Sequence, residues 1–166
     1  MKHLLKLLLG LFAIITIAAC SVDDGNTRPR CIEDFTGSLE TIETVLVGNW
    51  TLTALTSDPE VDLTQDGIDN ASQDIFAQYS DCLKDVEYSF EVDRAFSFRE
   101  GQNFTDCSNQ LIVEGTWKFT GLAVDLNSSC AVQTIPIRFN DDSSEFNDTG
   151  LITYADVNGN EIQTKT

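Results

Sequence analysis

Cys20 is the residue whose chemistry the sequence indicates most clearly. It ends an apolar run, residues 7–19, that follows two lysines and closes with two alanines. This run is too short to span a bilayer core, which needs about 20 residues, but it suits a cleaved signal. The pattern predicts a bacterial lipoprotein signal over residues 1–19 and a diacylglycerol thioether on Cys20. A general secretory signal with a small-x-small cleavage site is the alternative.

The residues after Cys20 are expected to form a tether. Residues 20–37 begin with a polar stretch that has too little apolar content to pack, so we expect a flexible linker. Acyl chains such as palmitate anchor a protein stably when two or more are present, since each buried methylene contributes about 0.8 kcal/mol. We therefore expect a lipid bilayer as partner through Cys20, at the bacterial outer membrane, on either its periplasmic or its cell-surface face.

The acidic composition of the chain excludes further classes of function. The chain has 27 acidic and 10 basic residues, for a net charge of −17. Such a chain repels nucleic acid, so we expect no nucleic-acid partner. The single histidine, His3, lies in the signal, and the mature chain then lacks the commonest acid–base catalyst. Carboxylate pairs such as Glu87 and Glu91 fall on solvent-facing positions, so we expect no enzyme and no catalytic residue.

Four cysteines remain after Cys20. An even number in an exported chain suggests two disulfides, for which three pairings are possible. We favour Cys82–Cys107, because each falls at the end of a predicted element with one hairpin between them; Cys31 and Cys130 then remain for the second bond. Their spacing fits no zinc motif.

Apolar residues alternate with polar ones over most of the chain after Trp50, which predicts strands with one buried face. The residues expected on the buried faces are Val86, Tyr88, Phe90, Val92, Phe96, Phe98, Val113, Gly115, Trp117, Phe119, Leu122, Val124, Leu126, Ile135, Ile137 and Phe139. Further strands are expected at residues 50–55, 150–157 and 161–166, with Asn158-Gly159 as a hairpin turn.

Two segments depart from this alternation. Helical spacing predicts a short helix over Ser38 to Val47, and Asn70 with Gln73 predicts a capping box before a second helix that ends near Cys82. The expected fold is all-β with two short helices. It is an antiparallel up-and-down β-barrel of about eight strands over residues 38–166, because closing the sheet removes its exposed edges.

The order of these features resembles that of the lipocalin-like lipoproteins of Gram-negative bacteria. The resemblance rests on a helix, Gly48-x-Trp50, an acidic loop, Cys82, a Phe-rich hairpin, Cys107 and Gly115-x-Trp117, and it covers roughly residues 38–157. It implies a lipocalin-like barrel. The C-terminal helix and the arginine motif of ordinary lipocalins are not recognisable in this sequence.

The acidic loop has the ligand spacing of the front of a calcium loop. Asp62, Thr64, Asp66 and the Ile68 carbonyl would supply oxygen ligands at alternate positions, with a glycine at the sixth. Asn70 and Asp74 complete the candidate Ca²⁺ site, and no other cofactor is expected. The alternative is an acidic surface turn that caps the following helix through Asn70.

Aromatic residues on the predicted strands could line a cavity for an apolar ligand. An eight-stranded barrel has an interior just wide enough to be filled by side chains or to hold one small molecule. A packed core without a cavity is the alternative. The candidate lining residues are Trp50, Tyr88, Phe90, Phe98, Trp117 and Phe119.

Two functions follow from these features. The first is a non-enzymatic binding or accessory module at the cell envelope, with a small apolar ligand or an envelope protein as partner. The second is a structural envelope protein with a packed barrel, no ligand and a calcium-stabilised acidic loop.

Overall fold

The computed structural model describes residues 31–64, 66–108, 110–155 and 161–166, and the side chains of these residues except 152–155 and 161–162. The predicted signal, Cys20 and the first part of the predicted tether lie outside the described residues. Residues 31–37, expected to belong to the tether, are part of one compact unit with the rest of the described chain.

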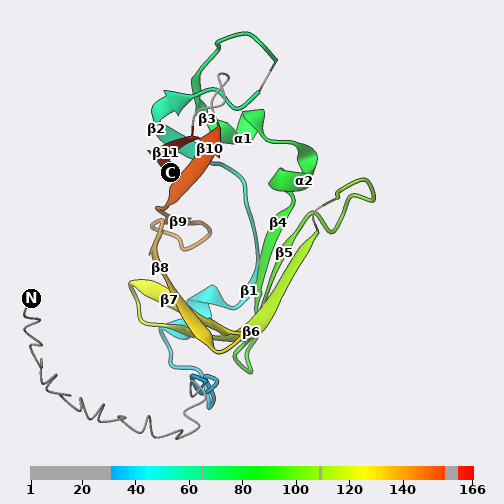
Figure 1. The fold of residues 1–166 in the computed structure, drawn as a ribbon. Helices are drawn as coiled ribbons and strands as arrows, with labels where there is room; N and C mark the ends of the chain where they lie inside the picture. Colours follow the sequence, from blue (N-terminus) through cyan, green and yellow to red (C-terminus); the bar gives the residue numbers. More distant parts are fainter. Residues whose placement is uncertain (1–30, 65, 109, 156–160) are drawn as a thin grey trace, which may run out of the picture. The chain divides into compact units, whose positions relative to one another are not determined.

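The described residues form mainly strands, as predicted (Figure 1). Within the described residues, helical structure is limited to a short 3-10 helix and two single-turn α-helices. The elements are η1 (Glu43–Leu46), β1 (Gly48–Thr51), β2 (Thr56–Val61), β3 (Ser72–Asp74), α1 (Ile75–Gln78), α2 (Asp81–Lys84), β4 (Val86–Phe90), β5 (Ala95–Glu100), β6 (Leu111–Phe119), β7 (Ala123–Ser128), β8 (Ala131–Phe139), β9 (Phe146–Asp148), β10 (Leu151–Ala155) and β11 (Glu161–Lys165).

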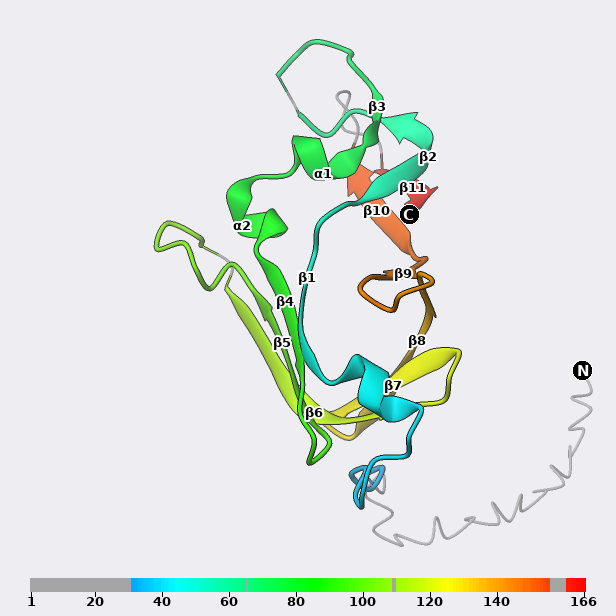
Figure 2. The same cartoon turned by 180° about the vertical axis from the view of Figure 1, so that it is seen from behind.

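Seven strands form one antiparallel sheet in the order β1-β4-β5-β6-β7-β8-β9. From β4 onward each strand pairs with the next one in the chain, so the sheet is an up-and-down meander. It curls so that β4 to β6 and β8 to β9 form facing walls, seen from opposite sides in Figures 1 and 2. The expected lipocalin-like antiparallel all-β arrangement is therefore confirmed, in the form of a half-barrel with β1 and β9 at its ends.

A second sheet has the order β10-β11-β2-β3. The sequence predicts the β10–β11 pair, and the register from Leu151↔Lys165 to Ala155↔Glu161 agrees with it. The predicted Asn158-Gly159 turn lies outside the described residues. Strand β2 was not predicted, because its sequence Thr-Ser-Asp-Pro-Glu-Val has no alternating apolar residues. Its Val61 side chain is nevertheless buried, at 2% exposure.

The first predicted helix is much shorter than expected. Residues 38–42 are not helical, and only η1 forms. A helix starting at Ser38 would use its carbonyl within the helix, but that carbonyl accepts a hydrogen bond from Arg94 Nη2 at 3.0 Å. Leu46 is fully buried, as helical spacing predicts, whereas Ile42 is exposed. A long-range polar contact therefore replaces the local helical bond.

The second predicted helix is divided, and its predicted capping box is wrong. Ser72 to Asp74 form strand β3, paired with β2, so Gln73 is not in a helix. The residue that caps α1 is Asp74, whose Oδ1 accepts a hydrogen bond from the Ala77 N–H at 2.9 Å. A separate turn, α2, then carries Cys82.

The main core lies on the concave face of the seven-stranded sheet. It contains Leu46, Phe90, Phe96, Trp117, Phe119, Val124, Leu126 and Ile137. Two predicted core residues, Val92 and Leu122, are instead 70% and 79% exposed, because they fall in the turns that precede β5 and β7. At Gly115 the strands approach closely: an added Cβ would lie 2.0 Å from the Asn127 carbonyl oxygen.

Candidate functional site

Three aromatic side chains form a row across the concave face. The register pairs Trp50 on β1 with Tyr88 on β4, and Tyr88 with Phe98 on β5. Paired residues in a sheet point to the same face, so all three point inward with Phe90, which lies two residues from Tyr88. Each keeps part of its side chain exposed. We call Trp50, Tyr88 and Phe98 the aromatic row.

The other predicted lining residues have little surface left for a ligand. Phe90, Trp117 and Phe119 are 1%, 0% and 4% exposed. The Phe90 and Trp117 rings contact at 5.3 Å in an edge-to-face arrangement, a favourable geometry for buried aromatic pairs. We call this packed cluster, together with Leu46, the floor of the half-barrel. Of the six candidates, only the aromatic row retains accessible surface.

Side chains join the two ends of the sheet where the strand pairing stops. The Trp50 ring on β1 lies 4.9 Å from the Phe146 ring on β9 and 5.8 Å from the Phe139 ring on β8, between centroids. In the sheet order β1 pairs with β4 and β9 with β8, so their outer edges are the ends of the ladder. Aromatic packing therefore holds β9 against β1.

The pKa of Tyr88 on β4 is affected by a carboxylate on β9. Burial raises the pKa of the Tyr88 phenol above its usual value near 10, and the charge of Asp148 raises it further. Asp148 pairs with Ile137, whose side chain is buried in the core, so Asp148 also points to the concave face. The aromatic row thus has an acidic neighbour that the sequence analysis did not identify.

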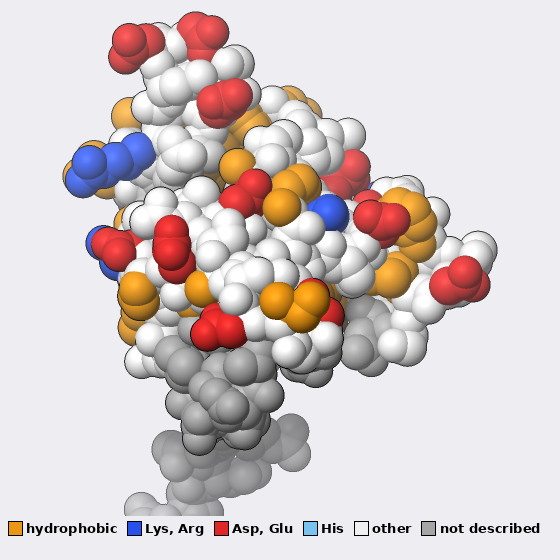
Figure 3. All heavy atoms as spheres, turned by 90° about the horizontal axis from the view of Figure 1, so that it is seen from above, with side chains coloured by type: hydrophobic (Ala, Val, Ile, Leu, Met, Phe, Trp, Pro, Cys, Tyr) orange, Lys and Arg blue, Asp and Glu red, His pale blue; other side chains and the backbone are white. Residues whose placement is uncertain are grey.

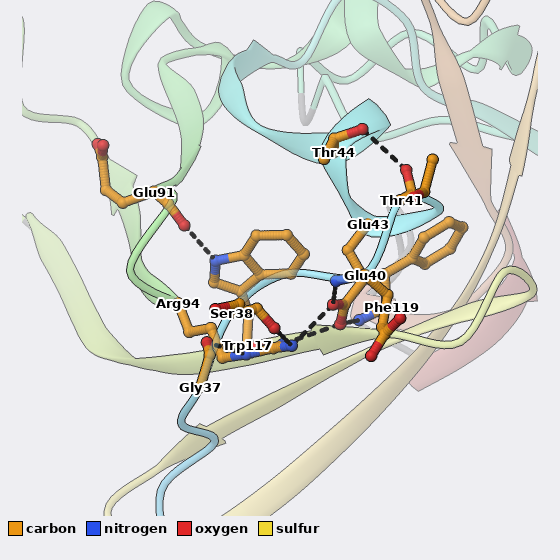
Figure 4. A network of polar contacts seen from close by, with 10 residues as sticks. All are labelled: Gly37, Ser38, Glu40, Thr41, Glu43, Thr44, Glu91, Arg94, Trp117 and Phe119. Atoms are coloured by element: carbon orange, nitrogen blue, oxygen red, sulfur yellow. Dashed lines mark hydrogen bonds and ion pairs between the residues drawn. The ribbon is translucent and has the colours of Figure 1, made fainter.

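A buried ion pair between Arg94 and Glu43 lies beside the floor (Figure 4). Arg94 Nη1 and Nη2 donate to the two Glu43 carboxylate oxygens at 2.8 and 2.7 Å. The remaining guanidinium donors bind the carbonyls of Gly37 at 3.1 Å, Ser38 at 3.0 Å and Trp117 at 3.3 Å. All five Arg94 donors are therefore used, which a buried guanidinium requires.

Glu43 is equally well satisfied. Its Oε2 accepts a bond from the Glu40 N–H at 2.6 Å, and its Oε1 accepts one from the Phe119 N–H at 3.3 Å. The hydrogen bonds from Arg94 are the largest cause of a lowered Glu43 pKa, against the opposing effect of burial. The pair connects η1, the β4–β5 turn and β6, so it holds these three segments together beside the floor.

The first described residues lie against the outside of β6 and β7. A disulfide joins Cys31 to Cys130, and another joins Cys82 to Cys107, as predicted. Asn127 Nδ2 donates to the carbonyls of Ile32 and Glu33 at 3.3 and 3.1 Å. The Phe35 N–H donates to Thr116 Oγ1 at 2.9 Å. A covalent bond and side-chain hydrogen bonds thus hold this segment on the sheet.

The acidic loop is held together by its own hydrogen bonds. Asp62 Oδ1 accepts bonds from the N–H and the hydroxyl of Thr64 at 2.9 and 2.8 Å, and Oδ2 accepts one from the Asn70 N–H at 3.2 Å. The bonds from Thr64 lower the Asp62 pKa. The loop brings these three candidate calcium ligands together.

The other candidate calcium ligands have separate roles. Asp66 Oδ1 accepts a bond from the Ile68 N–H at 2.8 Å, and Asp74 caps α1. Within the described ranges, no group of three or more His, Cys, Asp or Glu side chains is arranged to hold a metal ion. The calcium site remains a prediction from the sequence.

Comparison with known proteins gives a family. A family model for a domain of unknown function, DUF5004, matches residues 24–166, which is most of the chain. The chain belongs to the DUF5004 family. No curated protein and no solved structure matches this DUF5004 chain. Among its described residues, no helix has the length and apolar character needed to cross a membrane.

The sequence analysis did not identify several residues of the candidate site in this DUF5004 chain. Arg94 is one of them: it lies two residues before the buried Phe96, so alternation gives it a position on the buried face, and this was the available signal for a buried charge. Phe139 was assigned to a strand but not to the ligand-lining set. Phe146 and Asp148 follow a run of turn residues, 141–144, and lie on a strand of only three residues, where no alternation can be recognised.

Proposed function

We propose that the protein is a lipid-anchored module of the Gram-negative outer membrane that binds a small apolar ligand on the aromatic row. The module is non-enzymatic, and an envelope protein is the alternative partner. We also propose that it is related to the lipocalin-like lipoproteins. Two motifs support this relationship. Gly48-x-Trp50 lies on β1 and Gly115-x-Trp117 on β6, and both tryptophans occupy inward-facing positions of the half-barrel.

One observation carries the binding proposal: the aromatic row keeps exposed surface directly beside a filled floor. Trp50, Tyr88 and Phe98 are half-buried, whereas Phe90 and Trp117 are almost fully buried. A ligand seated on the row would remove its remaining apolar surface from water, at about 25 cal/mol per Å². The floor and the Arg94–Glu43 pair would provide a rigid base for that ligand.

Nile red, a neutral apolar dye, tests this proposal. We expect a saturable rise in its fluorescence with the purified mature domain. Trp50→Ala and Tyr88→Ala should each weaken binding about fivefold or more, because each removes roughly 1 kcal/mol or more of aromatic contact. Ile112→Ala is the matched control, because Ile112 is exposed on β6 and alternates to the outer face. Absence of saturable binding, or equal binding by all variants, would contradict the proposal.

The anchor is supported by the position of Cys20. It directly follows an apolar run that closes with two alanines, and it lies 11 residues before Cys31, the first described residue. Metabolic labelling with palmitate should label the wild-type protein and leave Cys20→Ser unlabelled. An unlabelled wild-type protein would contradict the anchor without affecting the binding test.

The second candidate is a structural envelope protein with a calcium-stabilised loop. The nearly complete burial of the floor favours this candidate, as does the convergence of Asp62, Thr64 and Asn70. A melting temperature that rises at millimolar calcium in the wild type, but not in Asp66→Ala, would support it. A bare mass in native mass spectrometry of protein from its source would also favour this role over ligand binding.

A further inference from the structure

Charged residues are distributed unequally between the two faces of the seven-stranded sheet. All residues of this sheet are described, and its basic residues, Arg99, Lys118 and Arg138, alternate with inward-facing neighbours. Each of the three is exposed on the outer face. Within the strands of this sheet, the concave face therefore carries no lysine or arginine.

Two carboxylates do lie on the inward-facing positions. Asp148 pairs with the core residue Ile137, and Glu100 pairs with Val86, which shares its face with Tyr88. Each acts on a tyrosine: Asp148 contributes to the raised pKa of Tyr88, and Glu100 to that of Tyr79, after the larger effect of burial. The inward face thus combines aromatic rings with negative charge.

Asp148 lies on the same strand as one of the packed aromatic rings. Phe146 is on the same strand and the same face, and its ring is 4.9 Å from the Trp50 ring. Trp50 in turn pairs with Tyr88, whose ring is 4.9 Å from the Phe98 ring. Ring faces attract cations through their quadrupole, and a carboxylate beside them adds direct charge attraction.

We propose that the ligand of the aromatic row is an apolar molecule that carries a cationic group of the alkylated ammonium type. This inference rests on the proposed binding function and specifies its ligand class. The ammonium would lie against Trp50 and Tyr88 near Asp148, and the apolar part would cover Phe98. The net charge of −17 would also raise the local concentration of a cationic ligand.

The distribution of charged side chains on the concave face should weaken the binding of anionic amphiphiles such as fatty acids. Their carboxylate would meet Asp148 and Glu100 and no basic residue of the sheet. The buried guanidinium of Arg94 is not available, because all five of its donors are used. Acidic side chains are spread over the face of the domain shown in Figure 3, with few lysines or arginines among them.

Displacement of Nile red by three probes of equal chain length tests the inference. The probes are dodecyltrimethylammonium, dodecanol and dodecanoate, all below their micelle-forming concentrations. We expect the ammonium probe to bind at least about tenfold more tightly than dodecanoate, and more tightly than dodecanol. High salt should leave a clear preference for the cation, because salt screens the overall charge more than a contact with the rings.

Variants assign the preference to the proposed residues. Asp148→Asn should weaken ammonium binding about two- to fivefold while dodecanol binding stays the same. Glu145→Gln, which removes an exposed charge three residues away in the chain, is the matched control and should have no effect. Trp50→Leu keeps an apolar side chain but removes the ring, and it should reduce the cation preference more than the dodecanol affinity.

The outcomes separate the two proposals. If neither Nile red nor any of the three probes binds, both the binding function and this inference fail. If dodecanoate or dodecanol binds as tightly as the ammonium probe, the binding function stands and the ligand class is wrong. An unchanged cation preference in Asp148→Asn and Trp50→Leu would likewise overturn the assignment to this site.

Discussion

Arg94 and Glu43 form a bidentate ion pair in which every donor of the guanidinium and both oxygens of the carboxylate are engaged. Both side chains are almost fully buried, at 6% and 1% exposure. The pair joins a segment near the start of the domain to the centre of the sheet, where it binds the Trp117 carbonyl and the Phe119 N–H. The domain therefore contains a buried polar network next to its buried apolar floor.

Breaking this pair should strongly destabilise the domain. Glu43→Gln leaves a buried positive charge without its partner, and we expect a loss of about 3–5 kcal/mol in the free energy of unfolding. Urea denaturation measures it. Glu87→Gln is the control, because Glu87 and Arg99 form a more exposed contact at 3.9 Å and should change stability by less than about 1 kcal/mol. Equal effects of the two substitutions would show that the buried network has no special role.

The same pair should make the domain sensitive to acid. The pKa of Glu43 is lower in the folded state than its usual value near 4.5, chiefly because of the hydrogen bonds from Arg94. A lowered folded pKa adds stability above the unfolded pKa, and this stability is lost as the pH falls through the folded pKa. The melting temperature should therefore decrease as the pH is lowered below about 4.5. Glu43→Gln should show a shallower fall over that range, and an unchanged slope would contradict the assignment.

Gly115 should tolerate no side chain. An alanine Cβ there would lie 2.0 Å from the Asn127 carbonyl oxygen and 2.8 Å from the Phe96 ring, so β6 and β7 would have to separate. We expect Gly115→Ala to cost at least about 2 kcal/mol in unfolding free energy. At Gly150 the nearest atom would be 3.5 Å away, and Gly150→Ala should change stability by less than about 1 kcal/mol.

The two disulfides should contribute unequally to stability. Cys31–Cys130 closes a loop of 99 residues and Cys82–Cys107 one of 25. In the chain-entropy model these are worth about 4.7 and 3.5 kcal/mol. Unfolding curves of the double variants Cys31→Ser/Cys130→Ser and Cys82→Ser/Cys107→Ser would measure the difference. Hydrogen exchange in the first variant should also show faster exchange at the Phe35 N–H, which now bonds to Thr116.

The ionisation of Tyr88 offers a test of the Asp148 charge near the aromatic row that needs no ligand. Its phenol should ionise above the usual pH near 10, because it is buried and close to the Asp148 charge. Ultraviolet absorbance of tyrosinate in Asp148→Asn should show one ionisation moved to lower pH than in the wild type. Since the folded pKa is the raised one, stability should decrease as the pH rises above about 10 towards that pKa. A titration curve that is identical in Asp148→Asn and the wild type would show that the Asp148 charge does not act on Tyr88.

The strands of the half-barrel could be predicted because their side chains have a buried and an exposed face. Tyr88, Phe98 and Trp117 all occupy the face that alternation assigned to them. The register between neighbours also follows from short hairpins, as at Ser128↔Ala131. A pattern with a period of two residues survives in the sequence whenever one side of a strand meets the core.

The elements that the sequence did not predict depend on distant partners. Residues 38–42 lose their helix because Arg94, more than 50 residues away, binds the Ser38 carbonyl. Strand β9 has three residues and is placed by rings on β1 and β8, so Phe146 and Asp148 enter the site from a segment without periodicity. The aromatic row of the candidate site could thus be predicted from residues on strands, whereas its charged residue, Asp148, could not.

The Cys31–Cys130 bond determines where mechanical tension would enter the fold if the chain is held through an anchor ahead of it. A pull on the polypeptide before Cys31 would bypass Ile32 to Phe35 and act directly on the tight turn between β7 and β8. There it would load a hairpin with six paired positions at once, instead of peeling off a terminal segment one contact at a time. A domain held in this way would therefore resist being drawn out from its N-terminal side.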